Sequence, residues 1–134
     1  MKVEFYGHVR QYHNIQSEID AKMQQVLLSG NYVQGPMLKE FEAEFAAYVG
    51  ARHSCAVSSC TTALHLGLLA VGVRPGDEVI TASHSFVATA NSVRYCGAKP
   101  VFVDIQPGTV NIDPQLVERV ITPATRAILC VHQI

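Results

Sequence analysis

The chain has 134 residues, of which 49% are hydrophobic and 16% charged, and its formal net charge is -1. This composition gives enough apolar material for one packed domain and too little charge for a disordered chain. The near-zero net charge gives no general attraction to nucleic acid or to an anionic membrane. No apolar run approaches the roughly 18 residues of a membrane span, and the first ten residues do not read as a signal peptide. We therefore expect a cytoplasmic protein with no nucleic-acid or membrane partner.

The N-terminal part of the chain is predicted to be helical. Apolar residues recur at helical spacing over residues 15–28, with Asn14 as the expected N-cap and Gly30 as the C-terminal stop. Residues 31–35 are expected to form a loop. A second helix is predicted over residues 36–50, because a leading proline loses nothing at a helix start, where its missing N–H would have no partner.

After residue 50 the pattern changes to short apolar strands that alternate with helices. Strands are expected at 54–57, 78–81, 100–103 and 127–131, and helices at 61–70, 86–95 and 114–121. Alternation at this spacing predicts βα units and a mostly parallel sheet with helices on both faces. We thus expect one α/β domain over 1–134, with a helical N-terminal segment at 1–50 and βα units at 51–134.

Four cysteines stand at positions 55, 60, 96 and 130. None forms a CxxC pair and their spacing is irregular, which argues against a zinc site or a disulfide framework. We expect reduced thiols and no metal site.

A first candidate site lies in residues 56–64, where an expected strand turns into a helix. Free N–H groups at a helix start, with the helix dipole behind them, favour an anion such as phosphate. The hydroxyls of Ser59 and Thr61 could add hydrogen bonds, and open α/β folds bind ligands at this edge of the sheet. The alternative is that these hydroxyls only cap the helix, and the pattern leaves both interpretations open.

Two further segments follow the next strands and should lie at the same edge. Phe86 stands at a strand-to-helix turn, where its ring either stacks on a flat ligand or belongs to the core. His84 could act as a base or contact phosphate, although a single loop histidine usually does neither. Asp104 follows the strand at 100–103 and could bind a ligand, although capping a turn is the commoner outcome.

Taken together, these segments resemble the DegT/DnrJ/EryC1/StrS family of sugar aminotransferases, which depend on pyridoxal 5′-phosphate (PLP). Matching segments occur in the family's order at 11–13, 29–36, 41–45, 58–66, 75–80, 85–91, 97–104, 111–114, 122–123 and 131–132. The resemblance implies the aspartate-aminotransferase-like (type I) fold and a homodimer. It implies that the chain is the N-terminal portion of the PLP-binding large domain.

The resemblance also assigns cofactor-binding roles. Cys60 and Thr61 lie where the family usually has a Gly-Thr pair that contacts the cofactor phosphate, and Ser59 precedes them. Phe86 lies where an aromatic ring stacks on the pyridine ring of the cofactor. Cysteine in place of glycine would be strained if the backbone there had a positive φ, and is harmless at an ordinary helix start, which we expect.

A loop near the active site and the dimer contact is implied for Asn31, Tyr32 and Gly35. Asn91 and Asp104 match family positions without a definite role.

The reaction implied by the resemblance transfers an amino group, typically from glutamate, to a keto sugar attached to a nucleotide. It needs a lysine that forms a Schiff base with the cofactor, which in the family lies downstream of the segment present here. None of Lys2, Lys22, Lys39 and Lys99 matches that position. We therefore expect an N-terminal fragment with no catalytic residue of its own, inactive alone. The alternatives are a fragment of a related sugar dehydratase, or a non-catalytic phosphate-binding or dimerisation module.

Overall fold

The computed structural model describes residues 6–132, and the chain divides into two compact units, Met1–Ala56 and Val57–Ile134. The first unit contains helices α1 (His8–Ser29) and α2 (Pro36–Val49). Both end at glycines in the left-handed conformation, Gly30 with φ 69° and Gly50 with φ 70°, as the sequence predicts.

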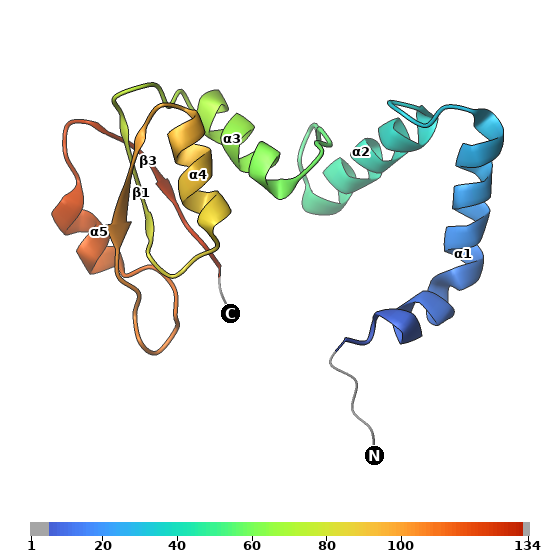
Figure 1. The fold of residues 1–134 in the computed structure, drawn as a ribbon, viewed down its shortest axis with the longest axis horizontal. Helices are drawn as coiled ribbons and strands as arrows, with labels where there is room; N and C mark the ends of the chain where they lie inside the picture. The colour runs from blue at the N-terminus through green and yellow to red at the C-terminus, as the bar shows by residue number, and fades with distance from the viewer. Residues whose placement is uncertain (1–5, 133–134) are drawn as a thin grey trace, which may run out of the picture. The chain divides into compact units, whose positions relative to one another are not determined.

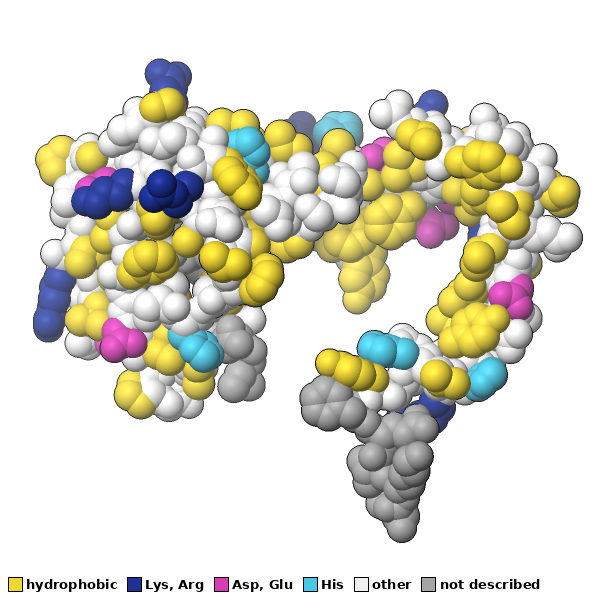
Figure 2. All heavy atoms as spheres, viewed as in Figure 1, with side chains coloured by type: hydrophobic (Ala, Val, Ile, Leu, Met, Phe, Trp, Pro, Cys, Tyr) yellow, Lys and Arg dark blue, Asp and Glu magenta, His cyan; other side chains and the backbone are white. Residues whose placement is uncertain are grey.

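Helix α1 begins earlier than the sequence predicts. Its N-cap is Gly7, so the expected N-cap, Asn14, lies inside the helix. No proline or glycine stands between residues 8 and 14, and once a helix has nucleated each further turn forms easily. Hydrophobic side chains remain exposed along both helices, as Figure 2 shows in yellow, and Ala46 is the buried residue that α2 contributes.

The second unit contains a parallel sheet in the order β2-β1-β3 (Figure 1). Its strands are β1 (Glu78–Ala82), β2 (Lys99–Val103) and β3 (Thr125–Leu129), and its helices are α3 (Cys60–Ala70), α4 (Val87–Tyr95) and α5 (Pro114–Val120). These strands and their parallel pairing confirm the α/β prediction for this part of the chain.

The strand predicted at 54–57 is not formed. In its place the N–H of Ala56 donates a hydrogen bond of 2.8 Å to the Glu42 carboxylate. A strand requires a neighbouring strand to accept its N–H groups, and a side chain on α2 takes that role here. The prediction of a strand here is therefore wrong, because an apolar run does not show whether a neighbouring strand is available.

Helices cover both faces of the sheet, as the crossover rule predicts (Figure 1). Successive residues of a strand point to opposite faces, so Val79 and Ile80 of β1 enter different layers. Val79 packs in a cluster with Leu68 of α3 and Val93 of α4. Ile80 packs in a second cluster with residues of β2 and α5, Val103 and Val117. Both β1 residues are fully buried, which makes β1 the centre of the unit.

An ion pair joins two strands at the amino end of the sheet. Glu78 and Lys99 are register partners, and Lys99 Nζ lies 2.9 Å from Glu78 Oε1. The Thr122 hydroxyl donates to the other carboxylate oxygen at 2.7 Å. The Lys99 ammonium, and after it the Thr122 hydroxyl, lowers the pKa of Glu78 below its ordinary value. The resulting stabilisation is present above the pKa of the unfolded chain and is lost as the pH falls through the lower pKa of the folded chain.

Replacing Lys99 by glutamine should therefore lower the unfolding free energy more at about pH 7 than at an acidic pH below the lowered pKa of Glu78, where the carboxyl is protonated. The effect should be modest, because exposed ion pairs contribute little. Urea denaturation at both pH values measures it. The Lys39→Gln variant is the control, because Lys39 is exposed and forms no ion pair with a residue that the structure describes. An equal loss at both pH values would contradict the assignment.

Candidate functional site

The start of α3 is capped by a serine. Ser59 has an extended backbone, with φ -162° and ψ 160°, and its hydroxyl accepts a hydrogen bond of 3.1 Å from the N–H of Thr62. The Thr62 hydroxyl lies 3.0 Å from the same oxygen and 3.3 Å from the hydroxyl of Ser58. The Ser59 side chain is thus engaged in capping, the alternative that the sequence left open for it.

Two backbone donors at this helix start stay available. Within residues 6–132 no acceptor bonds to the N–H of Cys60 or Thr61, and the half-buried Thr61 hydroxyl makes no hydrogen bond. The first turn of α3 contains no acidic residue. Two aligned N–H groups, a hydroxyl and the positive end of the helix dipole together suit an anion.

Cys60 occupies an ordinary helix position. It is the first residue of α3, and among the described residues only Gln34 and Val110 combine a side chain with a positive φ. The glycine that the family usually carries is therefore not required here for backbone freedom. The Cys60 thiol is exposed and lies beside the two donors.

Phe86 marks a second part of the site, at the carboxyl end of β1. It is the N-cap of α4, and the residue is 77% exposed, so the interpretation of Phe86 as a core residue is wrong. The ring borders a small pocket of about 160 Å³. The pocket is lined by Ala82, Ser83, Ser85, Phe86, Val87, Thr89, Ala90 and Phe102. An exposed aromatic ring beside a hollow rimmed by hydroxyls suits a flat ligand with polar substituents.

A pair of hydroxyls at this turn was not predicted from the sequence. The Ser85 and Thr89 hydroxyls lie 2.7 Å apart. Their spacing of four residues across Phe86 is visible in the sequence, but a hydroxyl pair at that spacing has many other uses.

Two other candidates have simpler roles. Asp104 accepts a hydrogen bond of 2.8 Å from the N–H of Ile105, so it caps the turn after β2. His84 is exposed and makes no hydrogen bond to a residue that the structure describes.

The candidate residues fall into three places. Ser59, Cys60 and Thr61 lie at the start of α3, and none of them lines the pocket beside Phe86, although both features belong to the second unit. Asn31, Tyr32 and Gly35 lie between α1 and α2 in the first unit.

The loop between α1 and α2 is held by local contacts. The Tyr32 hydroxyl donates to the Leu27 carbonyl at 3.2 Å, and the Asn31 N–H donates to the Ser29 hydroxyl at 3.1 Å. A Cβ atom on Gly35 would lie 2.7 Å from the Asn31 carbonyl oxygen, so glycine is required for this close approach.

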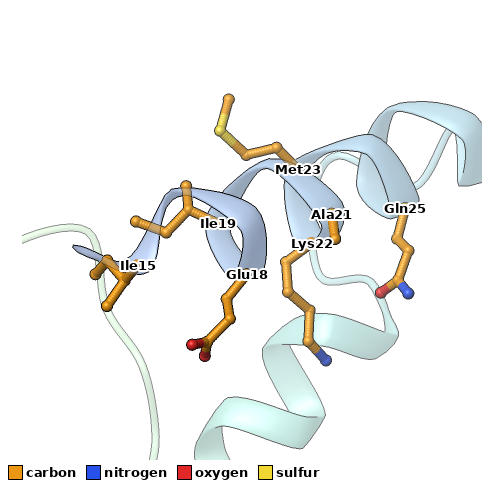
Figure 3. A pocket seen from close by; sticks show the side chains of 7 residues that line it. All are labelled: Ile15, Glu18, Ile19, Ala21, Lys22, Met23 and Gln25. Atoms are coloured by element: carbon orange, nitrogen blue, oxygen red, sulfur yellow. The ribbon is translucent and has the colours of Figure 1, made fainter. Parts of the chain in front are cut away.

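A separate hollow of about 520 Å³ lies along α1 in the first unit (Figure 3). It is lined by Ile15, Glu18, Ile19, Ala21, Lys22, Met23 and Gln25. The Lys22 ammonium is already paired with Glu40 at 3.4 Å. This hollow contains none of the residues that the sequence assigns to the cofactor.

In the described part of the chain, no group of three or more histidine, cysteine or acidic residues could hold a metal ion. Likewise, no helix within residues 6–132 is both long and apolar enough to cross a membrane. Burial raises the pKa of the Cys96 thiol, whereas Cys55, Cys60 and Cys130 are exposed.

Comparison with known proteins finds relatives of this chain. The model of the DegT/DnrJ/EryC1/StrS aminotransferase family matches residues 13–134. A UDP-2-acetamido-2-deoxy-3-oxo-D-glucuronate aminotransferase of Pseudomonas aeruginosa is 47% identical over 127 residues, which are 95% of this chain and 35% of that protein. A dTDP-3-amino-3,4,6-trideoxy-alpha-D-glucose transaminase of Streptomyces venezuelae is 45% identical over 98% of this chain and 35% of its own length.

Solved structures give the same result. The crystal structure of S. venezuelae DesV in complex with a ketimine intermediate matches 98% of this chain with a TM-score of 0.93 and 45% identity. A Bacillus subtilis structure, NtdA with bound cofactor PMP, matches 89% with a TM-score of 0.85 and 44% identity. The chain spans 35% and 27% of these two structures, so it corresponds to about a third of the relatives' length.

Proposed function

The chain belongs to the DegT/DnrJ/EryC1/StrS aminotransferase family, and from this we propose that it is the N-terminal part of a PLP-dependent aminotransferase that acts on a nucleotide-linked keto sugar. The observation that carries the proposal is the start of α3, where the N–H groups of Cys60 and Thr61 lack acceptors within the described residues. These are the two residues that the family resemblance assigns to the cofactor phosphate.

The residues present fit the phosphate end of PLP. The two N–H groups and the Thr61 hydroxyl would hold the phosphate, helped by the helix dipole and by the absence of an acidic residue in the first turn. The exposed Phe86 ring would lie against the pyridine ring, beside the pocket at the end of β1. When bound, the cofactor supplies an electron sink for amino transfer, and these residues bind and orient it.

The substrate and partner assignments follow from the family. The P. aeruginosa relative is an aminotransferase whose name specifies a UDP-linked 3-oxo sugar, which supports a nucleotide-linked keto sugar as the acceptor here. We propose glutamate as the amino donor, a homodimer as the assembly and the cytoplasm as the location. Asn31, Tyr32 and Gly35 would contribute to the substrate or dimer side of the site in the complete enzyme.

Alkylation of Cys60 tests the phosphate assignment, because this exposed thiol stands beside the proposed donors. Bound PLP should slow the reaction of Cys60 with iodoacetamide by about threefold when PLP is present at twice its Kd. Pyridoxal, which lacks the phosphate, should protect much less. Peptide mapping by mass spectrometry gives the rate for each cysteine.

The exposed thiols of Cys55 and Cys130 are internal controls whose rates should not change. The Thr61→Val variant preserves side-chain shape but removes a donor, so it should weaken the protection of Cys60. Equal protection by pyridoxal and PLP, or equal slowing of all three exposed thiols, would contradict a phosphate site at the start of α3.

A further inference from the structure

Helix α4 begins on a residue that cannot cap it. Its N-cap is Phe86, whose side chain makes no hydrogen bond to the helix. Serine, threonine, aspartate and asparagine are the residues that satisfy a helix start, and phenylalanine has no oxygen to offer. A residue that breaks the N-cap preference is typical of a functional position. Here the function would be to place an aromatic ring beside the pocket.

The ring itself is not oriented by packing. With 77% of its surface exposed, Phe86 has few neighbours to restrict it, unlike the buried residues of the adjacent strand. The direction of its Cα–Cβ bond is therefore set by the backbone of the turn. Whatever fixes this backbone also fixes where the ring can reach.

Thr89 contacts the turn through two groups. Its N–H donates to the Phe86 carbonyl at 3.0 Å, and its hydroxyl lies 2.7 Å from the hydroxyl of Ser85. Thr89 is buried, so both bonds are largely shielded from water. A hydrogen bond is stronger in such surroundings than in water. One residue thus holds Phe86 directly and holds the residue before it through a side chain.

We propose that Thr89 is a positioning residue, which acts through the Ser85 hydroxyl to fix the backbone of Phe86 and hold its ring at the pocket. The Ser85–Thr89 pair ties the residue before Phe86 to the first turn of α4, which has no side-chain cap. The consequence for cofactor binding rests on the proposed function, in which Phe86 stacks on the pyridine ring. The positioning of the Phe86 backbone by the Ser85–Thr89 hydroxyl pair, which we call the brace, depends only on the contacts of the turn.

Fluorine NMR of the 134-residue chain, with phenylalanine replaced by 4-fluorophenylalanine, measures the ring's environment directly. Thr89→Val preserves side-chain volume and removes the hydroxyl, so the Phe86 signal should shift by more than its line width or broaden. Thr89→Ser restores the hydroxyl and should restore the signal. Phe41 and Phe45 lie on α2 in the first unit and should keep their signals in every variant, so they serve as internal references.

Ser92→Ala is the matched control. Ser92 is another buried hydroxyl of α4, but its hydroxyl donates to the Thr89 carbonyl at 2.8 Å and not to a group in the turn before the helix. Its removal should leave the Phe86 signal in place. If Thr89→Val fails to fold, Ser85→Ala removes the same bond from the half-buried side and should shift the Phe86 signal in the same way.

An unchanged Phe86 signal in a folded Thr89→Val or Ser85→Ala variant would overturn the proposal. A PLP titration of the same samples tests the proposed function separately. If the stack forms, PLP moves the Phe86 signal of the unsubstituted chain, and Thr89→Val should weaken binding by about three- to tenfold, as expected for one hydrogen bond. Failure of PLP to move that signal would contradict the stack while the fluorine result on the brace would stand.

Discussion

Replacing Ile80 by alanine is expected to lower the unfolding free energy of the second unit by about 2–5 kcal/mol. Ile80 is fully buried in the central strand, where it packs with Val103 and Val117. Deleting three of its side-chain carbons removes apolar burial and leaves a cavity that this small layer can fill only in part. Domains of this size are stable by only about 5–15 kcal/mol, so the loss is a large fraction of the total. Urea denaturation followed by circular dichroism measures it.

Ile128→Ala is the matched control. Ile128 is the register partner of Ile80 on β3, but 48% of its surface is exposed. The same substitution should therefore cost less than half as much at this position. Equal losses of unfolding free energy at the two positions would contradict an apolar layer that buries this face of β1 but leaves the same face of β3 partly exposed. Because the start of α3 belongs to the same unit as β1, the Ile80 variant should also lose the protection of Cys60 by PLP at temperatures where this unit is partly unfolded.

The sheet could be predicted because its strands are short apolar runs between clear turn signals. Buried strands such as β1 need such runs on both faces, and the alternation of Val79 and Ile80 between two layers follows from strand geometry. The segment at 54–57 is also a short apolar run, but within residues 6–132 no strand pairs with it. Strand formation depends on that partner, which a local pattern does not contain, so the prediction failed there.

The site could be predicted only in part, for a similar reason. The motif around Thr61 and the position of Phe86 are visible as sequence, and the family resemblance gave them roles. The hydroxyl contact between Ser85 and Thr89 could not be predicted from the sequence, because it depends on the burial of Thr89 and on a separation of 2.7 Å. The Ser59 hydroxyl shows the opposite case, since both capping and ligand binding fitted its sequence and the structure shows the capping bond.

The 134-residue chain alone is expected to transfer no amino group from glutamate to a keto sugar. Amino transfer with PLP needs a lysine that bonds covalently to the cofactor. Lys99 lies at the amino end of β2, paired with Glu78 at 2.9 Å, while Phe86 follows the carboxyl end of β1. Strands β1 and β2 are parallel, so Lys99 and Phe86 lie at opposite ends of the strands.

The other lysines are no better placed to act. Lys22 is paired with Glu40 at 3.4 Å within the first unit, and Lys39 is exposed on α2. Lys2 lies outside the described residues. A lysine activated for bonding to a carbonyl is usually desolvated or set beside another cation, and neither Lys22 nor Lys99 has that environment, because each faces a carboxylate.

Reduction with borohydride after incubation with PLP, followed by peptide mapping, measures covalent attachment at each lysine. We expect slow labelling spread over the exposed lysines, equal for PLP and pyridoxal and unchanged in Thr61→Val. Rapid, stoichiometric labelling of one lysine that depended on the phosphate and on Thr61 would contradict the prediction, because it would place the chemistry within these residues. The expected pattern would mean that no lysine among these residues is placed to bond specifically to the cofactor.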